Sequence, residues 1–268
     1  MAIRIKTAKE ISVLQECGKR LAAILKALQE KARPGTATGE IDLLAQNLIR
    51  DAGGIAVFRG YRVEDSPPYP ASICTSINDE VVHGIPRPDT YLREGDILAI
   101  DIGMAWPRES AKEFPSYQGR PLVTDTAVSF SIGNSTRESD RLLRGTKEAL
   151  WEGIDEVKSG KRVGDLSARI QKKLTEYGFG IVKGLAGHGV GYELHEDPLI
   201  PNYGKAGTGP LLKTGMVLAI EPMATLGKGD VRLDRDGWTF QTIDGSASAH
   251  FEHTVVLTLN GTLVLTMI

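Results

Sequence analysis

The chain has 268 residues, of which 41% are hydrophobic and 25% charged, as is ordinary for a soluble globular protein with a large core. Its formal net charge of −2 gives no reason to expect nucleic-acid binding. Two cysteines, Cys17 and Cys74, argue against a disulfide framework, and no apolar run is long enough for a membrane span. These features predict a cytoplasmic protein, and a monomer is the default expectation.

The first half of the chain predicts two helices followed by strands. Residues 7–10 have the Thr-x-x-Glu form of a capping box, and apolar residues at helical spacing follow until Pro34-Gly35. A second helical pattern runs over 41–49 and stops at a Gly-Gly pair. The next stretch, 55–74, is rich in Pro, Tyr and Gly and predicts a loop with short strands, whereas 74–101 predicts strands separated by turns.

Residues 105–121 hold three prolines and scattered charges between two strong strand patterns. We interpret them as a long hairpin loop within one domain, because both flanking strands carry carboxylates. The second half repeats the order of the first, with helices expected before Gly178 and strands expected at 180–182, 216–221, 238–243, 251–259 and 262–266. Helices followed by strands in each half predict an α+β fold, since a doubly wound sheet would alternate strand and helix.

One ten-residue sequence motif occurs twice in the chain. Residues 92–101 read LREGDILAID and residues 212–221 read LKTGMVLAIE, so each apolar run follows a glycine and ends on a carboxylate. Further pairs keep the same order, among them a His-x-x-Pro at 83–86 and 195–198, and the offsets stay between 112 and 127 residues. Four ordered pairs predict a duplicated half-domain, with pseudo-repeats at about 7–132 and 135–268 inside a single domain of residues 1–268.

The repeat places acids where buried strands should not carry them. Asp101 and Glu221 are equivalent in the two halves, as are Asp125 and Glu252, which each open a β-branched run. Taken singly, such an acid is more often a solvated edge residue, but a symmetric set indicates that all four face one site. Two unit charges about 4 Å apart repel by roughly 4 kcal/mol at an effective dielectric of about 20, so four converging acids need cations.

Two divalent cations would neutralise four carboxylates, and a pair of metals is a known hydrolytic arrangement. His188 is flanked by glycines that leave its imidazole unobstructed as a further ligand, although a turn residue is the alternative. Oxygen-rich ligation plus one imidazole suits Mn, Fe or Co, and Zn is an alternative. The residues therefore predict a dinuclear site whose bridging hydroxide attacks a carbonyl, with these metal ligands: Asp101, Asp125, His188, Glu221 and Glu252.

The other four histidines fall into two groups. His83 and His195, from the repeated His-x-x-Pro, are candidates for catalytic proton handling or for polarising the substrate. The alternative for each is a core histidine satisfied by a backbone carbonyl. His253 should face away from Glu252 in an extended stretch, whereas His250 could share its face, and we predict neither as a metal ligand.

Seven ordered motifs, which cover nearly the whole chain, resemble those of methionine aminopeptidase, at 76–86, 95–101, 124–127, 187–191, 195–198, 220–223 and 251–255. The resemblance implies the pita-bread fold, a pseudo-two-fold domain that agrees with the repeat. It also implies removal of the N-terminal methionine from nascent proteins, preferentially when the second residue is small. The ribosome is one place where the resemblance would have the chain meet these substrates. Only a short stretch separates Pro198 from Glu221, so the chain is most similar to the short, bacterial-like type I form.

The resemblance also implies roles for single residues. Asp125 and Glu252 would bridge the two metals, Asp101 would bind one of them, and His188 with Glu221 would bind the other. Glu221 would also take and return a proton, while His83 and His195 would contact the scissile peptide and stabilise its developing charge. A pocket for the methionine side chain would be lined by the following residues, for whose aromatic members plain core packing is the alternative: Phe58, Tyr61, Tyr69, Cys74, Leu194 and Trp238.

Two insertions depart from the family pattern. One lengthens the connection between Asp101 and Asp125 at 105–121, the other lies at 63–68 within the pocket segment, and both are expected near the site entrance.

Two other functions stay open. A prolidase or Xaa-Pro aminopeptidase shares the fold, although such relatives usually carry an additional N-terminal domain. A non-catalytic binding protein on this fold would lose metal ligands, and all five are present here.

Overall fold

The computed structural model describes residues 3–63, 66–107 and 120–267. Its long helices are α1 (Ala8–Lys31), α2 (Thr38–Asp51), α3 (Arg137–Asp155) and α4 (Val163–Glu176). The capping box predicted at Thr7 is present, because the Thr7 hydroxyl accepts from the Glu10 backbone N–H and the Glu10 side chain accepts in return. Helix α3 is capped by Thr136, whose hydroxyl accepts from the Ser139 backbone N–H.

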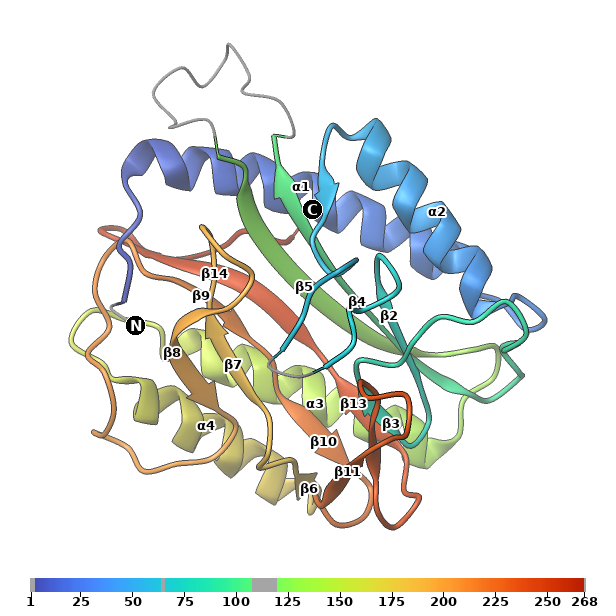
Figure 1. The fold of residues 1–268 in the computed structure, drawn as a ribbon. Helices are drawn as coiled ribbons and strands as arrows, with labels where there is room; N and C mark the ends of the chain where they lie inside the picture. Colours follow the sequence, from blue (N-terminus) through green and yellow to red (C-terminus); the bar gives the residue numbers. More distant parts are fainter. Residues whose placement is uncertain (1–2, 64–65, 108–119, 268) are drawn as a thin grey trace.

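The strands form one large curved sheet and two small ones (Figure 1). Their bounds in chain order are β1 (Ile55–Ala56), β2 (Cys74–Ile77), β3 (Glu80–Val82), β4 (Ile97–Trp106), β5 (Leu122–Ser131), β6 (Gly180–Ile181), β7 (Ala186–Gly189), β8 (Glu196–Pro201), β9 (Val217–Ile220), β10 (Met223–Thr225), β11 (Val231–Leu233), β12 (Phe240–Thr242), β13 (Ser248–His250), β14 (Glu252–Thr258) and β15 (Gly261–Val264). The large sheet has the order β1-β4-β5-β14-β9-β7-β8, with β2 also paired to β4 and β15 to β14. The mixture of helices and sheet confirms the predicted α+β class.

The order of the central strands reflects the sequence repeat. Strands β4 and β9 contain or precede the equivalent acids Asp101 and Glu221, and β5 and β14 carry Asp125 and Glu252. In the sheet these strands run β4-β5-β14-β9, so equivalent strands lie at equal distances from a central seam. At that seam β5 and β14 are antiparallel, with Glu252 opposite Ala127. A pseudo-two-fold axis that relates the two halves of the sheet therefore passes between β5 and β14.

Two apolar clusters join the helices to the sheet. Buried leucines of α1 at positions 14, 21 and 28 belong to a cluster that includes Ile100 and Met104 of β4. A second cluster joins α3 and α4 to β9 and β14. Figure 1 shows α1 and α3 crossing behind the central strands, which leaves the opposite face of the sheet for other groups. No helix in the described ranges is long and apolar enough to cross a membrane.

Several strand predictions need correction. Asp101 lies in the middle of β4 and not at its end, because the strand continues to Trp106. The hairpin predicted around 105–121 is confirmed by ten paired positions between β4 and β5, while 108–119 lie outside the described residues. Strands that the sequence did not indicate are β7, β8, β10, β11 and β13. The glycines and prolines in β7 and β8 explain why strand propensity missed them.

Candidate active site

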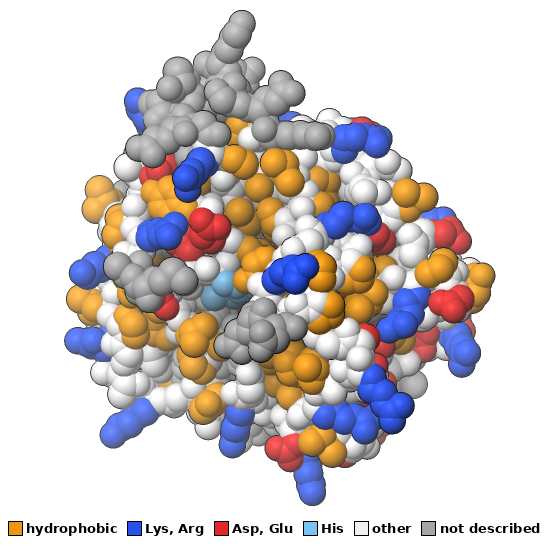
Figure 2. Space-filling view, in the orientation of Figure 1, with side chains coloured by type: hydrophobic (Ala, Val, Ile, Leu, Met, Phe, Trp, Pro, Cys, Tyr) orange, Lys and Arg blue, Asp and Glu red, His pale blue; other side chains and the backbone are white. Residues whose placement is uncertain are grey.

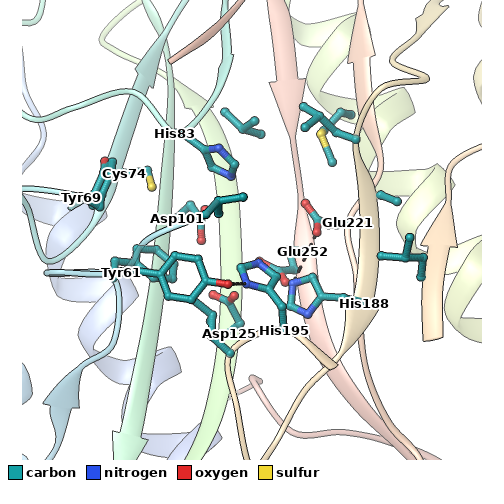
Figure 3. A pocket seen from close by; sticks show the side chains of 18 of the residues that line it. Tyr61, Tyr69, Cys74, His83, Asp101, Asp125, His188, His195, Glu221 and Glu252 are labelled. Carbon is teal, nitrogen blue, oxygen red and sulfur yellow. Dashed lines mark hydrogen bonds and ion pairs between the residues drawn. The ribbon is translucent and has the colours of Figure 1, made fainter. Parts of the chain in front are cut away.

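A cavity of about 580 Å³ is lined by residues from both halves of the sheet (Figure 3). Its size is typical of small-ligand sites. The cavity wall contains every residue that the sequence assigned to the metal site, the catalytic group and the methionine pocket: Phe58, Tyr61, Tyr69, Cys74, His83, Asp101, Asp125, His188, Leu194, His195, Glu221, Trp238 and Glu252. Figure 2 shows a histidine near the middle of this face, with both apolar and charged side chains around it.

Strand register brings the carboxylates to one place. Asp101 is opposite Ala127 on β5, and Glu252 is opposite the same alanine from the other side. Asp125 is opposite Gly103, where a Cβ would lie 2.7 Å from a Val57 methyl and 3.4 Å from an Asp125 oxygen. The small residues between the acids therefore leave room for their side chains to converge on the cavity.

The acids are buried without enough hydrogen-bond donors. Burial raises the pKa of Asp101 to about 7, and it also raises the pKa values of Asp125 and Glu252, with repulsion from neighbouring carboxylates adding to the effect. Oδ1 of Asp101 and Oε1 of Glu252 have no hydrogen-bond partner among the described residues. Buried oxygens of this kind are what a cation would satisfy.

Asp125, His188 and Glu252 form the tightest group of donors, with one ligand atom from each lying within 4.8 Å of the others. His188 Nδ1 lies 3.0 Å from the Gly189 carbonyl, an arrangement in which Nδ1–H donates and Nε2 stays free as a ligand. Asp101 and Glu221 line the same cavity outside this group. The donor set of carboxylates and one imidazole fits a divalent transition-metal ion.

His83 is held in an unusual backbone conformation. Its φ of 60° lies in the left-handed region, which is costly for a residue with a side chain. The next residue is Gly84, where a Cβ would lie 2.4 Å from the Thr75 carbonyl oxygen. The His83 ring packs edge-on against Trp238 and Phe240. This tight turn aims the imidazole into the cavity (Figure 3).

His195 is placed by Tyr61 and lies beside His188. The Tyr61 hydroxyl oxygen is 2.6 Å from His195 Nδ1, and the rings of His195 and His188 are 4.3 Å apart. Burial lowers the pKa values of His83 and His195 to about 4 each. Both imidazoles are therefore neutral at pH 7, when each ring carries one donor and one acceptor nitrogen.

The predicted methionine pocket is mainly aromatic. Tyr69 meets Phe58 and Trp238 edge-on, at centroid separations of 6.4 and 5.2 Å. Its hydroxyl donates to the carbonyls of Ile73 and Gly84, so the polar end of the ring is satisfied away from the cavity. The Trp238 indole N–H donates to the Pro67 carbonyl at 2.9 Å. This bond ties the described part of the 63–68 insertion to the pocket.

Comparison with known proteins identifies the family. The model of Metallopeptidase family M24 matches residues 12–259. The methionine aminopeptidase of Clostridium acetobutylicum is 41% identical over 265 residues, which are 99% of each chain. The chain belongs to the methionine aminopeptidases of family M24. The crystal structure of a methionine aminopeptidase from Thermotoga maritima has a TM-score of 0.91 and 40% identity, and it covers 100% of both chains. The pita-bread fold and the family resemblance are thereby confirmed.

The proline-directed alternative shares only the fold. Prolidase from Pyrococcus furiosus is 22% identical with a TM-score of 0.75, and the match covers 98% of this chain but 65% of that one. Methionine aminopeptidase 1 of Bacillus subtilis, in contrast, is 40% identical over 98% of both chains. Assignment to the methionine aminopeptidases is therefore favoured over assignment to the prolidases.

The structure adds cavity residues that the sequence did not indicate. Leu185 and Leu199 line the cavity, and Leu199 is an exposed apolar residue of β8, whereas Val63, which also lines it, belongs to the 63–68 insertion expected near the entrance. Leu199 lies between buried neighbours in β8, a strand that the sequence did not indicate, so no sequence pattern pointed to it. Glu196 holds the loop before it by accepting from the backbone N–H groups of Tyr192 and Glu193, and it also accepts from the buried Lys6, 190 positions away, a contact for which no local pattern exists.

Proposed function

We propose that the chain removes N-terminal methionine from peptides and nascent proteins with two divalent cations, Co, Mn, Fe or Zn. The observation that carries this is one cavity combining a buried cluster of acids with an aromatic, sulfur-bearing pocket. Bound divalent cations would activate water and polarise the scissile carbonyl. The proposed ligands are Asp101, Asp125, His188, Glu221 and Glu252, with Asp125 and Glu252 bridging.

The remaining polar groups handle the peptide and the proton. The Glu221 carboxylate takes a proton from the water that attacks the scissile carbonyl and returns it to the leaving amine. The neutral rings of His83 and His195 donate to the peptide as charge develops on it. When the Tyr61 hydroxyl donates to Nδ1 of His195, the ring proton must sit on Nε2, where it is available for donation.

The pocket favours methionine for physical reasons. Phe58, Tyr69 and Trp238 offer ring edges and faces, with which a polarisable thioether makes favourable contacts. Cys74 adds a second soft group, and burial raises the pKa of its thiol, so it remains a neutral apolar wall. The preference for a small second residue is proposed by analogy with the family.

The proposal extends to the setting of the reaction. Its substrates are the N-termini of nascent chains in the cytoplasm, met at the ribosome, and the enzyme acts as a monomer. A reducing compartment suits a chain whose cysteines, Cys17 and Cys74, are both free and buried. A net charge of −2 supports neither nucleic acid nor an anionic membrane as a partner.

The test combines metal analysis with a peptide panel. The purified chain should bind two equivalents of divalent cation and cleave Met-Ala-Ser much faster than Ala-Pro-Ala. Asp125→Asn should bind less metal and lose turnover while keeping the thermal unfolding of the native chain. Faster cleavage of the proline peptide would reverse the assignment in favour of a prolidase. Absence of cleavage with Mn²⁺, Co²⁺ and Fe²⁺ would indicate a binding protein.

A further inference from the structure

His250 is a buried imidazole that the reaction described above does not use. It ends β13 and is 2% exposed. Neither ring nitrogen makes a hydrogen bond of regular geometry with the described residues. A buried polar group without a partner costs about 1–3 kcal/mol, so a histidine kept in this position calls for a compensating role.

The ring faces one oxygen of Glu221. His250 Nε2 lies 3.2 Å from Oε2 of Glu221, whereas His188 Nε2 lies 3.6 Å from Oε1. The two carboxylate oxygens therefore point at two different histidines, of which only His188 belongs to the proposed cation ligands. Because a carboxylate can only accept, the proton of the His250 ring must lie on Nε2 for this approach to be attractive.

The backbone that carries His250 is fixed on both sides. The Ser129 hydroxyl of β5 accepts from the His250 backbone N–H and donates to the His250 carbonyl, each at 2.8 Å. On the other side His250 is paired with Met223 of β10. The Glu221 backbone is held as well, since the Asn202 side-chain amide donates to its carbonyl at 3.0 Å. A rigid donor thus faces a carboxylate whose own backbone is anchored.

We propose that His250 is a positioning residue whose Nε2–H holds Oε2 of Glu221 and thereby leaves Oε1 directed at the cation site beside His188. This rests on the proposed role of Glu221 as a cation ligand. Without that contact the carboxylate can rotate about its terminal bond and present either oxygen or both. Groups that orient a metal ligand in this way typically change metal affinity or activity by about 10–100-fold when they are removed.

The test compares two substitutions at one position. His250→Phe keeps the ring volume but has no donor, whereas the amide of His250→Gln can place an N–H near the position of Nε2. His253→Phe is the matched control, because His253 lies in the next strand with its ring against Trp151 and not in the cavity wall. Mn²⁺ affinity of the metal-free chain is measured by calorimetry, and the Co²⁺ absorption spectrum reports the ligand geometry.

The expected result is separation of the two variants. His250→Phe should bind Mn²⁺ about 10–100-fold more weakly with an altered Co²⁺ spectrum, and at saturating metal kcat should fall while KM for Met-Ala-Ser stays unchanged. His250→Gln should recover most of the affinity, and the His253→Phe control should bind like the native chain. Thermal unfolding of each metal-free variant checks the fold, and His250→Leu replaces the Phe variant if that one fails to fold.

Two results would overturn the positioning role alone. One is native affinity and a native spectrum in His250→Phe. The other is equal weakening in the Phe and Gln variants, which would make the imidazole itself a ligand. A native chain that binds no divalent cation would overturn the proposed function together with the positioning role, so the two failures are distinguishable.

Discussion

Removing the charge of Lys6 should destabilise the protein strongly. The Lys6 side chain is 1% exposed, and its Nζ donates to Oε2 of Glu196 at 2.7 Å, where the partner is 4% exposed. Oε1 of Glu196 accepts from the backbone N–H groups of Tyr192 and Glu193. Burial lowers the pKa of Lys6, and the bond to Glu196 opposes that shift. The pair therefore consists of two buried charges that satisfy each other.

The loss in the free energy of unfolding depends on which member of the ion pair remains buried. Removing one member of a buried ion pair costs about 3–5 kcal/mol of the free energy of unfolding. Lys6→Met leaves a carboxylate that still accepts two backbone bonds, so the cost should lie near the lower end, about 3 kcal/mol. Glu196→Gln leaves a buried ammonium supported by the Tyr192 ring at 5.0 Å and by the charge of Glu10, so the cost should approach about 5 kcal/mol. The double variant buries no charge and should be no less stable than Glu196→Gln alone.

Urea unfolding of the metal-free chain measures these costs without a contribution from cation binding. With a slope of about 3 kcal/mol per molar, a loss of 3 kcal/mol lowers the midpoint by about 1 M. The control is Lys31→Met, because Lys31 is paired with Glu40 at exposures of 41% and 53%, and it should cost less than about 1 kcal/mol. Additive single effects in the double variant, or a Lys6→Met cost equal to that of the control, would refute the reasoning.

Three further substitutions test the site and the fold. Cys74→Ser should raise KM for methionine peptides with little change in kcat, and an unchanged KM would place Cys74 outside the pocket. Tyr61→Phe loses the contact with His195 Nδ1 and should lower kcat about tenfold, whereas a change confined to KM would limit Tyr61 to lining the pocket. Burial lowers the pKa of His253 to about 4 from 6.5, so the unfolded chain takes up its proton first and stability falls as pH drops from about 6.5 to 4. That loss is at most about 3 kcal/mol, and the stability of His253→Gln, measured by urea midpoints, should depend less on pH over this range.

The sequence was sufficient to predict that the four acids line one cavity, because their signal is local. An apolar run that contains or precedes a carboxylate is anomalous by itself, and its repetition at Asp101 and Glu221 predicted that both face one place. The structure puts them on or beside β4 and β9, at matching positions about the seam. The predicted capping box at Thr7 was equally local and is present.

What the sequence could not predict depends on partners distant in the chain. Strand β7 reads Ala-Gly-His-Gly, a poor strand sequence, and it forms because His188 and Gly189 pair with β9. Strand β8 contains two prolines and is stabilised by pairing with β7. The contact of Lys6 with Glu196 spans 190 positions, and that of Tyr61 with His195 spans 134. In β7 and β8 the pairing with neighbouring strands overrides the poor strand propensity. The two long-range contacts leave no local pattern in the sequence from which they could be predicted.

The seam between the halves is held by threonines that stand next to the acids. Only two residue pairs join β5 to β14 through the backbone. Thr126 Oγ1 donates to the Glu252 carbonyl, and Thr254 Oγ1 accepts from the Asp125 N–H and donates to the Asp125 carbonyl. These bonds fix Asp125 and Glu252 beside each other whether or not a cation is bound. Their mutual repulsion must then be relieved by protons in the metal-free chain.

That arrangement predicts that cation uptake releases protons. Burial raises the pKa of Asp101 to about 7 and those of Asp125 and Glu252 as well, so at pH 6 the metal-free cluster carries protons that ionised ligands must lose. Calorimetric titration with Mn²⁺ at pH 6, in buffers that differ in ionisation enthalpy, counts the protons released per cation. We expect about one or more at pH 6 and fewer at pH 8. Release of none at pH 6 would mean that the acids are already ionised, and that the seam does not force them together as the structure indicates.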